Sequence, residues 1–270
     1  MLRSDLHAES SGEILREGLA TVEEEPLVVN PTRETMRALV ETVKESRSPV
    51  KLFADPRPLK DLVDDFLVAS TLADLVEEGV LDIRTLEDVP RHSLFVSEEF
   101  IVSFVESQNE TAGLTTTEES FVTETVEYYE TRWERADAFT LRTPPLTHIR
   151  ETLESEIGSE AVDDFDRMLD TLETARGDGE GLDEVTITLL VAANNRELLY
   201  DISRWGEDIR LASKATFSRT KNHLEDAGLI DTEKVPIDVG RPRLRLLLGE
   251  TELEEASIET VTQQAEQRLA

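Results

Sequence analysis

Ile209–Leu248 reads IRLASKATFSRTKNHLEDAGLIDTEKVPIDVGRPRLRLLL, and this stretch decides the fold of the C-terminal part of the chain. The whole chain has 59 acidic against 28 basic residues and a formal net charge of −31. A cluster of positive charge kept within so acidic a chain indicates a polyanionic partner. The basic residues of the stretch are Arg210, Lys214, Arg219, Lys221, Lys234, Arg241, Arg243 and Arg245, against the acids Glu225, Asp226, Asp231, Glu233 and Asp238.

A helix is predicted from Lys214 onward. Ser213 precedes it as an N-cap, because its hydroxyl can accept a hydrogen bond from a backbone amide of the first turn. Phe217 and Leu224 recur on one side, and Gly228 supplies the left-handed residue that ends many helices. At about 100° per residue, the opposite face carries Lys214, Ala215, Ser218, Arg219 and Asn222.

A pair of strands is predicted after this helix, over about 232–237 and 243–248, with a turn at 238–241. In the second strand leucines alternate with arginines, which is the period of two of a half-buried strand. Two further helices, over about 182–193 and 196–205, precede the basic stretch. This order of helices and a basic hairpin is typical of a winged helix-turn-helix, which occupies residues 182–250.

The helix and hairpin supply the predicted contacts with double-stranded promoter DNA. Arg219 and Asn222 suit guanine and adenine edges in the major groove, and Lys214 and Ser218 lie beside them. Ser213 and Thr216 are placed to bind a phosphate near the helix start. Three wing arginines follow the backbone or enter the minor groove. They are Arg241, Arg243 and Arg245. The alternative is an adaptor that uses its winged helix for protein contacts without binding DNA.

Residues 214–230, KATFSRTKNHLEDAGLI, resemble the recognition helix of archaeal winged helix-turn-helix regulators, and GRPRLRLLL at 240–248 resembles their wing. Taken whole, the chain resembles the TbsP-like transcriptional regulators of haloarchaea. The resemblance implies control of genes of central carbon and sugar metabolism, together with co-regulation by a sugar-sensing TrmB-type regulator.

Composition sets further limits. The apolar fraction of 39% is too high and too periodic for a disordered acidic chain. A halophile's acidic surface is the better interpretation, and molar salt removes much of the counterion release that drives DNA binding. The chain has no cysteine, and we find no signal peptide or membrane-spanning stretch. We therefore expect a cytoplasmic protein that depends on base contacts, shape and dimerisation.

The first 110 residues predict an α/β domain with a mostly parallel sheet. A helix over 4–20 comes first. Strands at 27–29, 50–54 and 81–85 alternate with two helices, the second over 56–78, which favours parallel pairing. A hairpin with strands at 93–97 and 100–106 extends the sheet. This half resembles the phospholipase D-type fold of TrmB sensor domains.

An effector site is predicted beyond the carboxyl ends of these strands. Asn30, Thr32 and Arg33 follow one strand, and Asp55 and Arg57 follow the next. Each group puts an arginine at a helix start, where a phosphorylated sugar would find backbone amides and a favourable dipole. Arg91 precedes a later strand and completes the set. The alternative is that Thr32 and Asp55 only cap helices while the arginines pair with local acids.

Signals of an enzyme are missing from the sequence. It has no GxGxxG, P-loop or HExxH motif, and its four histidines lack metal-ligand spacing. A phospholipase D site needs His-x-Lys, but Leu94 follows His92-Ser93 where the lysine belongs. We expect a sensor without catalysis, metal or cofactor.

The middle and the end of the chain raise the question of a homodimer. After a polar loop at 107–118, residues 118–176 form a helical connector, and a Gly-rich linker at 176–181 marks the domain boundary. A last helix lies within 251–270 and packs on its own domain or pairs with a second chain. We expect a homodimer that reads half-sites about 34 Å apart. A short heptad seam marks either a dimer helix or a helix packed on its own domain; it comprises Val122, Val126, Tyr129, Trp133 and Ala136.

Overall fold

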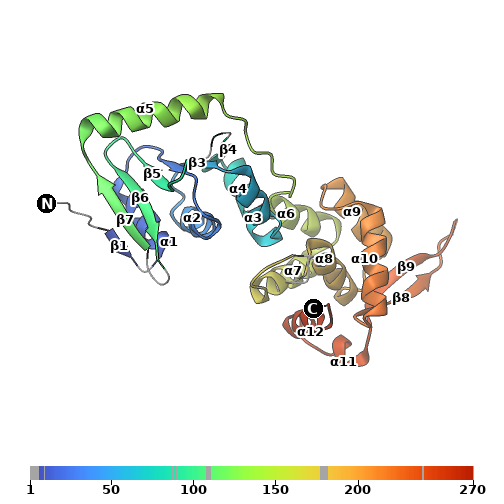
Figure 1. Cartoon of the computed structure of the whole chain (residues 1–270). Coiled ribbons are helices and arrows are strands. Elements are labelled where there is room, and N and C mark those ends of the chain that lie inside the picture. The colour runs from blue at the N-terminus through green and yellow to red at the C-terminus, as the bar shows by residue number, and fades with distance from the viewer. Residues whose placement is uncertain are drawn as a thin grey trace. The chain divides into compact units, whose positions relative to one another are not determined.

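The computed structural model describes residues 6–8, 10–86, 88, 90–107, 111–176, 182–238 and 240–269. The chain divides into two compact units (Figure 1). The first comprises residues 1–64 and 71–141, and the second comprises residues 65–70 and 142–270. None of the described helices is long and apolar enough to cross a membrane.

A seven-stranded sheet forms the centre of the first unit, in the order β1-β7-β6-β5-β2-β3-β4. β2, β3 and β4 pair in parallel, where strands and helices alternate in the sequence, and the other strands pair antiparallel. The predicted α/β fold is thereby confirmed. The strands are β1 Leu6–Ala8, β2 Leu27–Val29, β3 Val50–Ala54, β4 Leu81–Thr85, β5 Leu94–Val96, β6 Ile101–Glu106 and β7 Thr111–Thr116.

Two strands at one side of the sheet differ from the prediction. Residues 6–8 form β1 where a helix was expected, and α1 starts only at Ser11 (Ser11–Thr21). Residues 111–116 form β7 where a loop was expected, and β7 lies between β6 and β1. Threonine is polar, but its branched Cβ favours a strand, so a Thr-rich strand such as β7 is misread as a loop.

Four helices connect the parallel strands or precede them. α2 (Arg33–Ser46) joins β2 to β3. The single helix expected over 56–78 is two helices, α3 (Pro56–Val63) and α4 (Phe66–Glu77). They separate at Asp65, whose buried Oδ1 accepts hydrogen bonds at 3.2 Å from the backbone amides of Leu67 and Ala175. A carboxylate that accepts from the amides of a new first turn starts a new helix.

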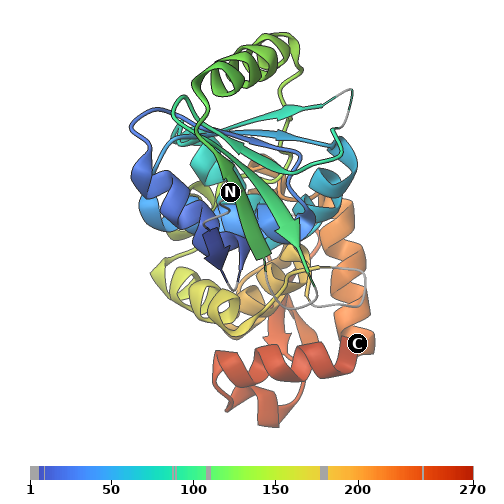
Figure 2. The ribbon, with the colours of Figure 1, turned by 60° about the vertical axis from the view of Figure 1, so that its left-hand side comes forward.

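The heptad seam lies on α5 (Glu119–Arg135), except that Ala136 follows the end of the helix. α5 packs along one face of the sheet, with α1 and α2 on the other face (Figure 2). Val122, Tyr129 and Trp133 are buried there, and the Trp133 ring meets the Phe53 ring edge-on at 5.5 Å between centroids. The seam therefore packs on its own domain, so the dimer-helix alternative is wrong for these residues.

The second unit is built around one hydrophobic core that includes the connector helices α6 and α7. At its centre α8 is buried on nearly all sides, from Val185 to Ala193. The expected connector, residues 118–176, is thus divided, because α5 belongs to the first unit. Residues 177–181 of the expected linker lie outside the described residues. The elements are α6 Leu146–Glu156, α7 Ser159–Thr171, α8 Glu184–Asn194, α9 Leu199–Asp208, α10 Lys214–Asp226, β8 Ile230–Val235, β9 Arg243–Leu248, α11 Thr251–Glu254 and α12 Ile258–Leu269.

The last helix of the prediction is also two helices, α11 and α12. Ser257 lies between them, and its hydroxyl accepts a hydrogen bond from the backbone amide of Thr260 (3.4 Å). Ile258, Val261 and Ala265 are buried in the core of the same unit. Of the two alternatives for this helix, packing on its own domain is the one observed.

Candidate nucleic-acid interface

α8, α9 and α10 form a helix-turn-helix, and the hairpin β8–β9 forms its wing (Figure 1). The crossing of α9 with α10 depends on Gly206. A Cβ added at this glycine would lie 2.4 Å from Cζ of Phe217, a distance that no real contact allows. Because Gly206 has no side chain, the buried Phe217 ring lies directly against the α9 backbone. This contact determines how closely α10 packs against α9.

α10 has the boundaries and faces that the sequence predicts. The Ser213 hydroxyl accepts a hydrogen bond from the backbone amide of Thr216 (3.1 Å), which confirms the N-cap. Gly228 has φ +70°, which confirms the left-handed C-terminal residue. Phe217 and Leu224 are fully buried, and Thr216 is half-buried. The exposed face consists of Ser213, Lys214, Ala215, Ser218, Arg219 and Asn222, with His223 beside them.

The wing is anchored at the start of α9. Leu198 forms an antiparallel bridge with Arg245, and the backbone amide of Leu246 donates to the Glu197 carbonyl (2.8 Å). Leu246 and Leu248 point into the core, as the alternation predicts. Arg241, in the turn of the wing, is exposed.

A groove of about 450 Å³ lies between α9, the start of α10 and the wing. Lys214 and Ser218 of α10 and Arg241 and Arg243 of the wing all line it. The fold thus brings together four of the residues predicted to contact DNA, although they come from separate parts of the sequence. Tyr200 of α9 also lines the groove, and the guanidinium of Arg243 lies 4.0 Å from the centroid of its ring.

Acids on neighbouring elements pair with three of the predicted DNA-contacting cations. Lys214 Nζ lies 2.7 Å from Glu207 Oε2 of α9. This pair raises the pKa of Lys214 and lowers the pKa of Glu207 through their side-chain hydrogen bond. The other two pairs are Arg243 Nη1 with Asp201 Oδ1 at 3.5 Å and Arg245 Nη1 with Glu233 Oε1 at 2.9 Å.

The sequence interpretation missed these partners. Tyr200, Asp201 and Glu207 precede the basic stretch, and only the packing of α9 brings them to it. Glu233 could have been found, since it stands opposite Arg245 in the hairpin register. Lys221, counted with the basic cluster, is buried and pairs with Glu225, so it does not belong to the exposed face.

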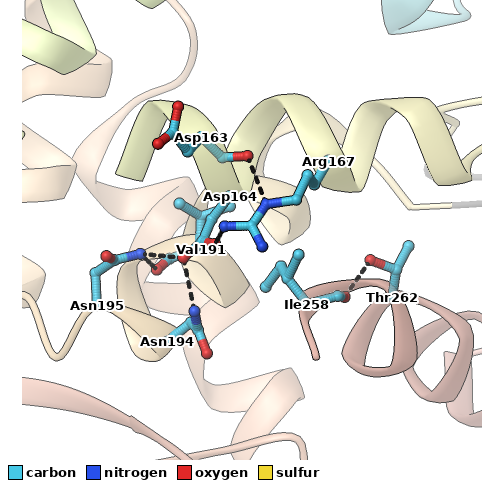
Figure 3. Close-up of polar contacts among 8 residues, drawn as sticks. All are labelled: Asp163, Asp164, Arg167, Val191, Asn194, Asn195, Ile258 and Thr262. Atoms are coloured by element: carbon cyan, nitrogen blue, oxygen red, sulfur yellow. Dashed lines mark hydrogen bonds and ion pairs between the residues drawn. The ribbon is translucent and has the colours of Figure 1, made fainter. Parts of the chain in front are cut away.

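A buried carboxylate fixes the helix-turn-helix to α7 (Figure 3). Asp164 is 6% exposed and accepts hydrogen bonds from the side chains of Arg167 (2.8 Å), Asn194 (2.6 Å) and Asn195 (2.8 Å). The two asparagines end α8, and Asn195 also donates to the Val191 carbonyl (2.9 Å). The carboxylate therefore holds the end of the central helix, just before the turn into α9.

We expect Asp164→Ala to destabilise the second unit by about 2 kcal/mol, because it leaves two amides and a guanidinium without their acceptor. Urea unfolding followed by the fluorescence of Trp205 measures this, in a Trp133→Phe background that isolates the second unit. The exposed neighbour provides the matched control, Asp163→Ala, for which we expect a change of less than about 0.5 kcal/mol. Equal effects of both substitutions would show that the hydrogen bonds of Asp164 do not contribute to the free energy of unfolding.

The predicted effector residues lie at the carboxyl ends of β2 and β3, where two of them form hydrogen bonds within the first unit. Thr32 caps α2, accepting from the Thr35 amide (3.2 Å), and its hydroxyl donates to Glu106 Oε1 (2.9 Å). Asn30 has φ +47°, and its side-chain amide donates to the Pro90 carbonyl (2.7 Å). For Thr32 the structure thus shows the capping role given above as the alternative.

The second arginine group follows the same pattern. Asp55 accepts from the Arg57 backbone amide (2.9 Å) and forms an ion pair with the Arg57 guanidinium (2.7 Å). These hydrogen bonds hold the pKa of Asp55 below its usual value. The Arg57 side chain remains 84% exposed, and Arg33 and Arg91 are also exposed. The structure therefore places three arginines near the predicted edge without enclosing them.

A cavity of about 310 Å³ lies in the first unit at the amino ends of β2 and β3, away from the predicted effector site at their carboxyl ends. Its charged lining includes Glu24, Glu98, Glu130 and Lys51. Glu98 raises the pKa of Glu24 through a side-chain hydrogen bond and charge repulsion. So acidic a lining repels an anionic metabolite. In the described part of the chain, no three His, Cys, Asp or Glu side chains are grouped to hold a metal.

A helix-turn-helix with an exposed polar face on α10 and a hairpin wing defines the DNA-binding domain of a transcriptional regulator. The chain belongs to the TbsP-like transcriptional regulators. Residues 3–144 match the family described as "Transcriptional regulator TbsP-like, N-terminal", and residues 145–266 match "Transcriptional regulator TbsP-like, C-terminal HTH domain". The border between the two matches falls close to the border between the two structural units.

Two solved structures are similar to parts of the chain. One is TrmBL2, described as an archaeal chromatin protein with a novel mode of DNA binding, at 16% identity and a TM-score of 0.38. That match covers 52% of this chain, which spans about half, 54%, of TrmBL2. The other is NucT from Helicobacter pylori, at 13% identity and a TM-score of 0.33, covering 48% of this chain and 91% of that one. No curated protein sequence matches the chain.

Proposed function

We propose that this regulator reads promoter DNA with α10 in the major groove and the wing on the adjoining backbone. One observation carries the proposal: α10 and the wing bring Lys214, Ser218, Arg241 and Arg243 to a single groove. Arg219 and Asn222 are exposed on the same helix, where a guanidinium and an amide suit guanine and adenine edges.

The remaining side chains suit backbone contacts. Ser213 and Thr216 lie at the N-terminus of α10, where hydroxyls and the helix dipole favour a phosphate. Arg241 is exposed in the wing turn, and Arg245 lies on the strand behind it. In this arrangement α10 selects the sequence, and the wing arginines fix the register of the domain on the duplex.

The homodimer remains part of the proposal. The heptad seam of α5 and the apolar side of α12 are both buried within the chain, so a dimer must use another surface. Two copies related by a two-fold axis would read half-sites about 34 Å apart.

The proposed DNA reading is tested by selection of binding sequences from random duplexes with the purified full chain at high KCl. We expect one enriched motif, arranged as an inverted repeat if the protein binds as a homodimer. A motif without symmetry would contradict the dimer but not DNA reading. If no motif is enriched over several rounds, the adaptor without DNA contacts becomes the better account.

We propose a phosphorylated metabolite as effector, bound at the edge formed by the ends of β2 and β3. Arg57 would exchange Asp55 for a phosphate oxygen, and the exposed Arg33 and Arg91 would supply further charge. The Arg57 side chain is 84% exposed and can turn towards a phosphate, whereas Asp55 is only 9% exposed and would keep its hydrogen bond from the Arg57 backbone amide.

Thermal unfolding with a panel of sugar phosphates at high KCl measures effector binding. At about 100 times its Kd, a ligand stabilises the folded chain by about 2.7 kcal/mol, so we expect a rise in Tm of several degrees. Arg57→Ala should abolish the rise, whereas the control Arg47→Ala, at the far end of α2, should preserve it. If no sugar phosphate raises the Tm of the wild type, the anionic effector is excluded for that panel.

The regulated genes are proposed from the family resemblance alone. They are genes of central carbon and sugar metabolism, regulated together with a TrmB-type regulator. The first unit acts as a sensor without catalysis in this proposal, because His92-Ser93-Leu94 lacks the lysine of a phospholipase D-type site.

A further inference from the structure

Three of the five basic residues on the proposed DNA face are already paired with carboxylates. Lys214 pairs with Glu207, Arg243 with Asp201 and Arg245 with Glu233. In the part of the chain that the structure describes, the other two cations, Arg219 and Arg241, form no ion pair. Asp201 and Glu207 lie on α9, which packs beside α10, and Glu233 lies on β8, the other strand of the wing.

The three pairs are open to solvent and therefore exchangeable. Between 33% and 46% of each acid side chain is exposed, and between 35% and 45% of each partner cation. Exposed pairs of this kind contribute little to stability and form and break readily. A DNA phosphate can replace each carboxylate as the partner of its lysine or arginine.

The displaced carboxylate stays beside the phosphate that displaces it, because α9 and β8 are fixed in the fold. Two anions that approach within a few ångströms repel each other unless a cation lies between them. Protonation does not remove this repulsion at neutral pH, because carboxylates in water ordinarily titrate at about pH 4. A monovalent cation from solution can lie between the carboxylate and the phosphate and offset their repulsion.

We infer that DNA binding by this chain takes up monovalent cations, one at each of Asp201, Glu207 and Glu233, as phosphates displace these acids from their basic partners. The inference rests on the proposed DNA-binding face. It gives the pairs a functional consequence, because cation uptake opposes the cation release that ordinarily weakens DNA binding as salt rises. The face then stays able to bind in concentrated salt.

The size of the effect follows from the number of charges. Five positive charges brought against the duplex, Arg219 in the major groove included, neutralise about five phosphates and give a slope of log affinity against log KCl of about −4.5. Uptake of three cations reduces this slope to about −1.5 in the wild type. The two values are far enough apart to separate in a titration over about a tenfold range of KCl.

The test compares the full chain with the triple variant Asp201→Asn, Glu207→Gln and Glu233→Gln, binding a selected operator duplex. We expect slopes of about −1.5 and −4.5, with the variant binding more tightly at low salt. A control variant removes three exposed acids elsewhere in the same unit, Asp170→Asn, Glu254→Gln and Glu255→Gln, and should keep the wild-type slope.

Replacing K⁺ with tetramethylammonium gives a second readout. This bulky cation does not fit between a carboxylate and a phosphate, so wild-type affinity should fall by about tenfold while the triple variant is unaffected. A wild-type slope near −4.5, or the same slope in wild type and triple variant, would overturn cation uptake while leaving DNA reading intact. If none of the proteins binds any duplex at any salt, the proposed DNA-binding function itself has failed.

Discussion

Replacing Arg219 with alanine is expected to weaken binding to the selected operator by about 10- to 100-fold, while binding to unrelated duplexes falls much less. Arg219 lies on the exposed face of α10 and has no ion pair among the described residues. Its planar guanidinium is the group best suited to two parallel hydrogen bonds with one guanine. Fluorescence anisotropy with matched and mismatched duplexes at one fixed salt concentration measures both affinities.

Two controls separate base reading from general charge. Arg219→Lys keeps the charge but loses the two-pronged geometry, so we expect near-normal binding to unrelated duplexes and reduced discrimination. Arg204→Ala removes an arginine of α9 that pairs with Glu156 of α6, and it should leave operator affinity within about twofold. Equal losses on operator and unrelated DNA in Arg219→Ala would assign this arginine to the backbone and contradict its role in sequence reading.

Gly206→Ala is expected to destabilise the second unit by about 3 kcal/mol and to abolish operator binding. Glycine to alanine inside a helix ordinarily stabilises the protein by about 1 kcal/mol. The change in the free energy of unfolding predicted for Gly206→Ala is therefore opposite in sign to the change expected from helix propensity. The reason is the Cβ, which would lie 2.4 Å from the Phe217 ring and force α10 away from α9. Urea unfolding with Trp205 fluorescence reports the stability of this unit.

A second substitution makes this prediction specific. Phe217→Leu removes the ring edge that the new methyl group meets, so the double variant with Gly206→Ala should be more stable than the sum of the single effects predicts. Gly12→Ala is the matched control in α1 of the first unit, followed by Trp133 fluorescence; there the added Cβ would lie at an ordinary 3.4 Å from Cβ of Ala38. Strict additivity of the two substitutions at α9 and α10 would show that the close approach does not determine how α10 is held.

The parts of the fold that the sequence predicts well carry local signals. Ser213 and Gly228 set the ends of α10 by their own hydrogen bonding and backbone conformation, and Leu246 and Leu248 set the core face of β9 by alternation. β1 was missed because its three residues are too few for a period and, unlike β2, contain no apolar run, and β7 was missed because its threonines indicated a loop. The break at Asp65 was missed because the acceptor role of a buried carboxylate depends on a distant backbone amide, that of Ala175.

In the candidate sites too, features set by local sequence could be predicted, and features set by packing between elements could not. The exposed face of α10 follows from helical geometry, so residues such as Arg219 and Asn222 could be placed in advance. The acidic partners of the basic residues could not be predicted from the sequence, because Glu207 reaches Lys214 only through the packing of α9 against α10. At the effector edge, one residue pattern fits both a helix cap and an anion site. The geometry of Asp55 and Arg57 shows a cap with a local ion pair.

The most direct test of sequence-specific DNA reading by α10 is chromatin immunoprecipitation with sequencing in the native organism. Strains with wild-type or Arg219→Ala protein at equal abundance are compared. The account predicts discrete wild-type sites that share one motif upstream of regulated genes and are lost in the variant. A wild-type profile that matches an untagged strain, or the same sites in both strains, would contradict it.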